Sequence, residues 1–297
     1  MTVSEFKLRR RQAYLDEQTY ENTLRWFDND EVILKEKLED QASRPRARSV
    51  TLSMLAYQLW NTFLMRYTAG ENIEGLASSL TQVVEAFERY VEACNEVPDS
   101  EYRAPFLLDD MIDTYVDYLN LLCAAVLLHR EDLIPRIAVL NEGTPYDMAD
   151  AVIEDLLGFY LNERSPLDSW FWKAYTPLLD AIDADTSTER QKGMSKYVKG
   201  WYKSMKGVAH FLGKHEEIKP EFSPYDGYWA MCAAAFTYLY DIDDSKYCDE
   251  LVYPKDMVDY ARSKSRQPVK LLDGSTVLRA LGGQPFPLDA LSANSKL

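Results

Sequence analysis

The sequence has few of the residues on which catalytic and metal sites depend. Only three histidines occur among its 297 residues, and His129, His210 and His215 are too scattered to hold a metal together. Neither a GxSxG nor an HExxH motif occurs, a glycine-rich phosphate-binding loop is missing, and no ExxH pair suggests a di-iron bundle. We therefore expect no catalytic residue, no metal site and no cofactor.

Cysteine and long apolar runs are also scarce. Cys94, Cys123, Cys232 and Cys248 show no CxxC spacing, and two of them lie in apolar helical runs, as is typical of reduced, buried thiols. The N-terminal stretch MTVSEFKLRRRQAYL has no apolar segment of the kind found in secretory signals. No apolar run reaches the roughly 20 residues needed to cross a bilayer. We expect a cytoplasmic protein with no membrane contact.

Positive charge is in short supply. The chain has 33 Lys and Arg against 48 Asp and Glu, a formal net charge of −15. Residues 51–150 hold 5 basic and 17 acidic residues, whereas residues 251–297 hold 7 and 4. So acidic a surface repels nucleic acid and anionic lipid and attracts a basic partner. We expect a basic protein partner, while the sequence leaves a homodimer open.

Apolar residues recur at helical spacing along most of the chain, and no segment alternates consistently enough for a β-sheet core. The expected fold is all-α, an irregular multi-helix bundle of antiparallel helices. Gly143 with Thr144 and Pro145 is the best boundary between an N-terminal helical region, 1–142, and a C-terminal one, 143–297, which we expect to pack as one unit. Beyond residue 264, a short hairpin over 269–278 and a short helix fit almost equally well.

The individual helices follow from apolar periodicity and from turn residues. Asp28–Asp30 is expected to break the first segment into two helices, and Pro177 to kink a later one. The expected helices are 4–42, 49–67, 73–95, 108–128, 133–140, 147–161, 166–182, 188–211, 228–240 and 255–264.

The stretch from Tyr228 to Tyr240 is predicted to form the central helix. It carries no charged side chain and has the densest run of small residues in the chain. A helix that is apolar on every side belongs inside a fold, and its alanines let neighbouring helices approach closely. We expect the other helices to pack around it.

The same stretch resembles a known family. The motif GYWA is followed by an alanine-rich run, then IDD, then YP with an acidic residue two positions on. This order is similar to the C-terminal signature of the PoNi immunity proteins, and the segment Arg10–Leu38 is similar to the opening helix pair of that family. The residues that carry the signature are Gly227, Tyr228, Trp229, Ala230, Ile242, Asp243, Asp244, Tyr253, Pro254 and Asp256, with Trp201 and Tyr202 matching upstream aromatics.

The resemblance implies a function. PoNi proteins are bacterial immunity proteins that neutralise polymorphic nuclease toxins delivered by type VI secretion. By resemblance, this chain would bind a cognate nuclease toxin and occlude its DNA-binding cleft, without being an enzyme itself. One departure is Cys232, which stands where the family usually has an acidic residue, so the partner of that carboxylate must differ here.

The main alternative is a metal-dependent enzyme. Asp109, Asp110 and Asp113 spell the DDxxD motif by which class I terpenoid and prenyl synthases hold Mg²⁺, and carboxylates at this spacing on a helix suit a hard cation. However, the motif would open its helix instead of following an apolar run, and no second metal motif occurs downstream. Acids in the first turn of a helix are also stabilised by the helix dipole alone.

The acidic clusters supply the candidate binding surface. Asp110, Asp113 and Asp117 are expected to form one exposed stripe opposite Met111, Tyr115 and Leu122. Glu85, Glu88 and Glu92 share a helical face and form a second candidate patch. A third cluster comprises Asp147, Asp150, Glu154 and Asp155. Any one such cluster is usually only a solvated face, but their concentration in one hundred residues favours a basic partner.

Overall fold

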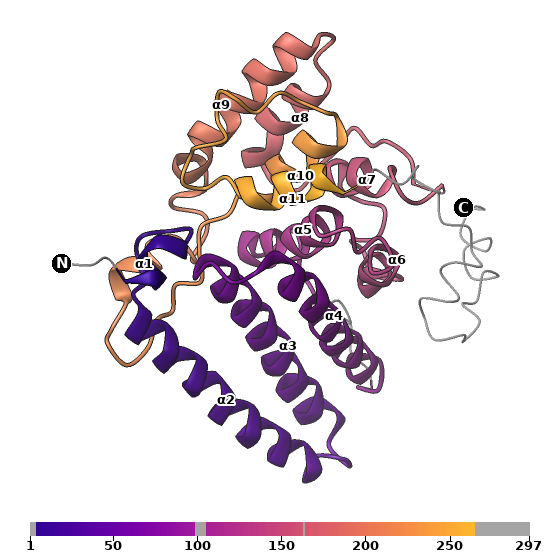
Figure 1. The fold of residues 1–297 in the computed structure, drawn as a ribbon. Helices are drawn as coiled ribbons and strands as arrows, with labels where there is room; N and C mark the ends of the chain where they lie inside the picture. Colours follow the sequence, from indigo (N-terminus) through magenta and orange to yellow (C-terminus); the bar gives the residue numbers. More distant parts are fainter. Residues whose placement is uncertain (1–3, 99–104, 163, 265–297) are drawn as a thin grey trace, which may run out of the picture.

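The computed structural model describes residues 4–98, 105–162 and 164–264 (Figure 1). These residues form helices joined by turns and loops, and among them no β-strand occurs, only an isolated bridge between Lys219 and Phe222. The all-α prediction is confirmed. The expected hairpin over 269–278, and the short helix from Ser275 to Leu281 weighed against it, lie outside the described residues.

The described helices agree with most of the expected segments. The α-helices are α1 (Glu5–Arg9), α2 (Glu17–Glu39), α3 (Pro45–Thr68), α4 (Ile73–Asn95), α5 (Ile112–Leu127), α6 (Ile134–Ala138), α7 (Ala151–Leu157), α8 (Thr176–Ile182), α9 (Ser187–Met205), α10 (Met231–Leu239) and α11 (Lys255–Ser263). Short 3-10 helices are η1 (Val139–Asn141), η2 (Lys173–Tyr175) and η3 (Lys214–Glu217). None of these helices is long and apolar enough to span a membrane.

The long helices α2, α3 and α4 lie side by side in the lower half of the molecule (Figure 1). The expected break at Asp28–Asp30 is wrong, since α2 runs through it without interruption. Asp28 and Asn29 face solvent, whereas Phe27 and Leu34 on the opposite face are buried. Their packing holds the helix together against the weak helix propensity of the exposed residues.

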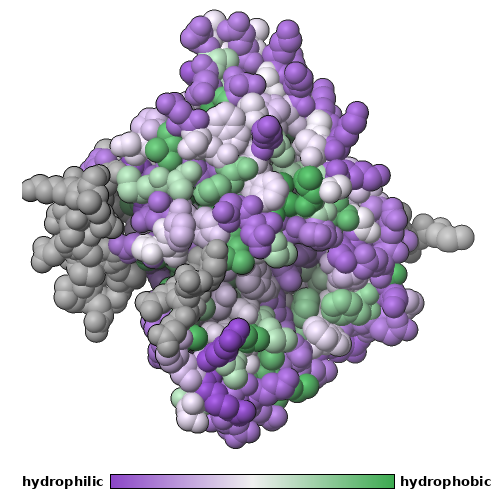
Figure 2. All heavy atoms as spheres, turned by 180° about the vertical axis from the view of Figure 1, so that it is seen from behind, coloured by the Kyte–Doolittle hydropathy of each residue, from purple (hydrophilic) through white to green (hydrophobic). Residues whose placement is uncertain are grey.

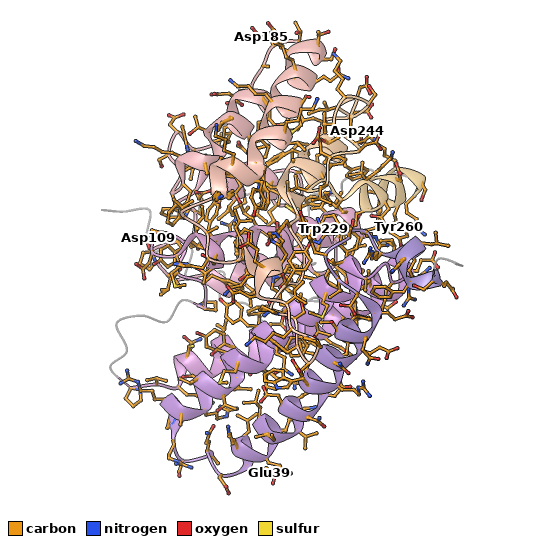
Figure 3. The ribbon with its side chains drawn as sticks, turned by 90° about the vertical axis from the view of Figure 1, so that its left-hand side faces the viewer. Glu39, Asp109, Asp185, Trp229, Asp244 and Tyr260 are labelled. Atoms are coloured by element: carbon orange, nitrogen blue, oxygen red, sulfur yellow. The ribbon has the colours of Figure 1, made fainter. Side chains whose placement is uncertain are left out.

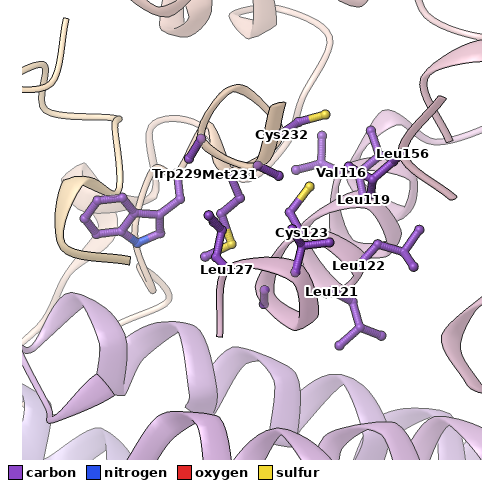
Figure 4. Close-up of a cluster of buried hydrophobic side chains, with 14 of the residues drawn as sticks. Val116, Leu119, Leu121, Leu122, Cys123, Leu127, Leu156, Trp229, Met231 and Cys232 are labelled. Atoms are coloured by element: carbon purple, nitrogen blue, oxygen red, sulfur yellow. The ribbon is translucent and has the colours of Figure 1, made fainter. Parts of the chain in front are cut away.

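Helices α5 and α10 form the centre of the fold. Every residue of α10, Met231–Leu239, is buried, which confirms the predicted buried central helix, although the helix begins at Met231 and not at Tyr228. Figure 4 shows α10 facing α5, with Met231 and Cys232 above Cys123 and Leu127. Helix α5 is almost as deeply enclosed, because only Asp113, Thr114 and Asp117 are not fully buried.

The upper part of the molecule differs most from the expected boundaries. Helix α8 begins at Thr176, with Pro177 in its first turn, so Pro177 starts the helix and does not kink it. The tip of the α8–α9 pair carries Asp185, far from the opposite tip at Glu39 (Figure 3). Seen from behind, hydrophilic side chains cover the upper tip, while hydrophobic ones gather around the middle and the lower half (Figure 2).

Candidate partner-binding site

The predicted patch on α4 is only partly available to a partner. Glu88 accepts two hydrogen bonds from the guanidinium of Arg136 on α6, at 2.7 and 2.5 Å, and both side chains are mostly covered. Glu85 is half-buried and Glu92 is exposed. Glu88 is therefore neutralised by a bidentate ion pair that joins α4 to α6, which leaves Glu85 and Glu92 as the less engaged carboxylates.

The predicted stripe on α5 does not exist as one exposed surface. Asp110 is exposed but precedes the helix, which begins at Ile112. Asp113 accepts hydrogen bonds from the backbone N–H groups of His210 and Phe211, at 3.1 and 2.9 Å, and lies 3.1 Å from the His210 ring. Its carboxylate anchors the loop after α9 to α5. The expectation of three carboxylates in one line is wrong because this helix is enclosed on nearly every side.

Asp117 is the clearest exception to the expected stripe. The indole N–H of Trp60 on α3 donates a hydrogen bond to its carboxylate at 3.0 Å. Burial raises the pKa of Asp117 to about 7, against an ordinary value of 3.8, and the nearby Asp113 adds to the rise. Met111, expected on the buried side, is instead exposed. The role of these acids in binding stays a prediction, but Asp113 also holds the fold together.

The DDxxD motif does not form a metal site in this geometry. Asp109 accepts a hydrogen bond from the hydroxyl of Tyr146 at 2.6 Å, Asp110 points to solvent, and Asp113 is bound to the loop after α9. Since α5 begins only at Ile112, the three carboxylates do not share one helical face. Within the described ranges, no group of three His, Cys, Asp or Glu is placed to hold a metal ion.

The third acidic cluster is structural. Asp150 is fully buried, caps α7, and accepts hydrogen bonds from the Tyr115 hydroxyl and the Phe171 backbone, at 2.9 and 2.8 Å. Arg164 pairs with Asp147 at 2.9 Å and with the buried Glu154 at 3.1 Å. These acids connect α5, α7 and the following loop, so they are not a free surface.

A cavity of about 230 Å³ lies where α3, α5 and the segment 210–229 meet. Asp117 reaches it from α5, and Asp226 reaches it from the segment just before the signature GYWA. Burial raises the pKa of Asp226 to about 8, and the charge of Asp117 contributes to this rise. The sequence analysis missed Asp226, because a lone aspartate beside a turn glycine carries no signal of burial.

Removing the charge of Asp226 is expected to stabilise the free protein. The folded state keeps the carboxyl protonated over a pH range in which the unfolded chain, with a pKa near 3.8, has released the proton. The free energy of unfolding therefore falls as pH rises from about 4 to about 8. Asp226→Asn should recover a few kcal/mol at pH 8, at ~1.4 kcal/mol per pKa unit, and almost nothing at pH 4.

Urea unfolding at several pH values measures this effect. Asp185→Asn, at an exposed tip, is the matched control and should change stability little at any pH. An Asp226→Asn protein that is less stable than the unchanged protein at pH 8 would contradict the interpretation.

The signature residues hold the two ends of the described chain together. The buried side chain of Gln12 donates hydrogen bonds to the backbone oxygens of Tyr228 and Leu251, both at 2.8 Å, and accepts one from the Tyr228 N–H at 2.9 Å. Gly227 has φ +126°, and a Cβ there would collide with the Trp229 indole. Only glycine fits this backbone without strain.

A second contact joins the N-terminal arm, the segment that carries Arg11 and Gln12 between α1 and α2, to the YP motif. Arg11 pairs with Asp256 and donates to the backbone oxygen of Glu71 at 3.0 Å, while its guanidinium lies 4.3 Å from the centre of the Tyr67 ring. The Tyr67 hydroxyl donates to Asp256 at 2.5 Å. The acidic residue of the motif is thus a structural anchor.

The IDD motif has the same kind of role. Asp244 accepts from Arg262 on α11 at 2.9 Å and from the Tyr253 hydroxyl at 3.0 Å. Asp243 accepts from Gln191 on α9 at 2.6 Å. These contacts fix the turn after α10 against the helices on both sides.

Cys232 occupies the position where the resemblance implies an acidic residue. It is buried on α10 and interacts with Cys123 on the facing side of α5 (Figure 4). Both thiols are free. Burial raises the pKa of Cys232 well above its ordinary value, so the thiol stays neutral. The neutral thiol of Cys232 thus fills a place where a carboxylate would need a polar partner.

A family model of immunity proteins matches the C-terminal part of the chain. Residues 148–257 match the family model described as PoNe immunity proteins (PoNi), C-terminal, which confirms the predicted PoNi-type family for this region. The matched region contains the whole signature from Gly227 to Asp256.

The fold also has a solved relative. The crystal structure of protein PA2201 from Pseudomonas aeruginosa is 20% identical in sequence and superposes with a TM-score of 0.57. The match covers 73% of this chain and 76% of that one. At this identity the likeness concerns the fold alone. No curated protein matches the chain.

Proposed function

We propose that the protein is an immunity protein that binds and neutralises a cognate antibacterial nuclease toxin delivered by type VI secretion, in the cytoplasm of the cell that makes it. The observation that carries the proposal is the PoNi match over residues 148–257. The net charge of −15 supports it, because a nuclease must present a positive groove to hold phosphates. An acidic surface placed over that groove would block DNA.

The carboxylates that lack a strong partner among the described residues are the proposed steering charges, which attract the basic toxin before contact. Asp110 and Glu92 are exposed, and Glu85 is half-buried without a bidentate partner of the kind that Glu88 has. Charges of this kind, at the rim of an interface, mainly raise the association rate and its dependence on salt. Asp113, Asp117 and Glu88 remain in the proposed surface, but replacing Asp113 or Glu88 would also remove contacts that hold the fold together.

The neutralisation test uses the toxin encoded beside the gene of this protein. Cells that express the nuclease domain should stop growing and lose their DNA, and co-expression of this chain should restore growth. In vitro, the purified chain should inhibit DNA cleavage at a one-to-one ratio. If it binds no adjacent toxin and restores no growth, the proposal is wrong.

Charge reversal tests the steering surface. Changing Glu85, Glu92 and Asp110 to Lys should lower the association rate constant by about tenfold or more at low salt and reduce its salt dependence. Stopped-flow binding measures both. The control reverses three exposed acids elsewhere, Glu39, Asp168 and Asp185, and should change the rate less. Equal association rates in the two triple variants would show that Glu85, Glu92 and Asp110 are not the steering charges.

A further inference from the structure

The cavity between α3, α5 and the segment 210–229 is large enough for the end of a long side chain. Its walls include Leu64 from α3, Val116 and Asp117 from α5, and Phe211 and Asp226 from the loop segments. Its volume of about 230 Å³ exceeds the ~150 Å³ that holds a benzene molecule in an engineered protein cavity. Apolar and charged groups therefore share one pocket that is partly open to solvent.

The charges that face this cavity are not balanced. Lys214 lies on its wall but pairs with Glu217 at 3.0 Å, and the His210 ring pairs with Asp113 at 3.1 Å. Among the described residues, Asp117 receives a hydrogen bond only from the neutral indole of Trp60. The Asp226 carboxyl makes no hydrogen bond to another residue of the described ranges.

Two largely buried carboxyls without a cation are costly to the free protein. A buried charge is normally paired with an opposite charge, and neither of these two acids forms an ion pair within the described residues. A cation that enters the cavity would be stabilised by electrostatic attraction to both carboxylates. Within the described chain, no third ligand is placed to complete a metal site, so an organic cation fits the donors better than a metal ion.

We propose that this cavity binds the guanidinium of an arginine side chain presented by the toxin, held between the carboxylates of Asp117 and Asp226. The inference rests on the proposed function and names how the partner is recognised. A planar guanidinium with five donors can bond two carboxylates from different segments at once, and the walls formed by Val116 and Phe211 suit its methylene stem. Nucleases use arginines to hold phosphates, so an arginine bound here is withdrawn from DNA.

The first experiment uses N-propylguanidinium as the probe, followed by the indole N–H resonances in ¹⁵N–¹H spectra at alkaline pH. Trp60 is the reporter, because its N–H donates to Asp117. Saturable shifts of its signal with a Kd on the order of millimolar are expected for a fragment held by charged hydrogen bonds. The neutral analogue N-propylurea should cause no such shift.

Charge-neutral variants show whether the cavity is responsible. Asp117→Asn with Asp226→Asn should abolish the saturable shift, while the matched control Glu39→Gln with Asp185→Asn, at the two tips of the molecule, should keep it (Figure 3). Both pairs remove the same charge. An equal response in the two double variants, or none in the unchanged protein, overturns the proposal.

The second experiment measures binding to the nuclease domain of the adjacent toxin by calorimetry. Loss of one partner of a buried charge pair commonly weakens binding by about 30-fold or more, so the cavity variant should lose at least that and the control variant little. Unchanged affinity of a folded cavity variant overturns the inference but leaves the immunity function standing. If the unchanged protein binds no toxin, the immunity function fails, and the propylguanidinium titration still decides whether the cavity binds cations.

Discussion

Replacing Ala234 by aspartate is expected to leave no folded protein. Ala234 lies in the middle of α10 and is fully buried, and this helix packs against α5, α9 and α11. A carboxylate there has neither water nor a cation, and its burial costs several kcal/mol, comparable with the whole stability of a domain, about 5–15 kcal/mol. Soluble yield and far-ultraviolet circular dichroism measure the outcome.

The control for Ala234 is the same substitution at an exposed alanine. Ala42 lies in the turn after α2 and faces solvent, so Ala42→Asp should fold and melt like the unchanged protein. An Ala234→Asp protein that melts at the unchanged temperature would show that α10 is not the buried centre of the fold.

Replacing Gln12 by alanine is expected to cost about 3–5 kcal/mol of stability, because several buried groups lose their partner and each costs about 1–3 kcal/mol. The groups are the Tyr228 N–H and oxygen, the Leu251 oxygen and the Tyr225 hydroxyl. Since Gln12 joins the N-terminal arm to the signature segment, the arm should also become sensitive to proteases.

Gln18 offers a matched control for Gln12. Its side chain is exposed and, within the described part of the chain, bonds only to Asn22 one turn further along α2, at 3.2 Å. Gln18→Ala should change the free energy of unfolding, measured by urea titration, by less than about 0.5 kcal/mol. Should Gln12→Ala also have so small an effect, the hydrogen bonds of Gln12 would not be what ties the two ends together.

Local sequence determined the helices whose ends and faces are encoded within a few residues. Helix α4 spans Ile73–Asn95 as predicted, since Asn72 caps it and its apolar residues repeat every three or four positions. The central helix was evident from its lack of charge. Helix α2 was misread because Asp28–Asp30 has the composition of a turn, and only packing on α3 overrides that preference.

The candidate site could be predicted from the sequence less well than the helices. The excess of acidic residues in 51–150 was plain, but the state of each carboxylate depends on a partner far along the chain. Asp117 is held by Trp60, Glu88 by Arg136 and Asp113 by the loop after α9. Spacing on one helix cannot reveal such contacts, so acids that seemed to share an exposed stripe or patch lie in different environments.

The sequence by itself determined the all-α class, the acidic charge, the buried central helix and the resemblance to PoNi, because composition, periodicity and motifs are local properties of the chain. Only the tertiary structure decided what the motifs do. Gln12 and Arg11 meet the signature more than two hundred residues away, and Asp226 shares a cavity with Asp117. Polar groups become buried and paired when distant segments pack together. This packing decides which acidic side chains stabilise the fold and which are available to bind a partner.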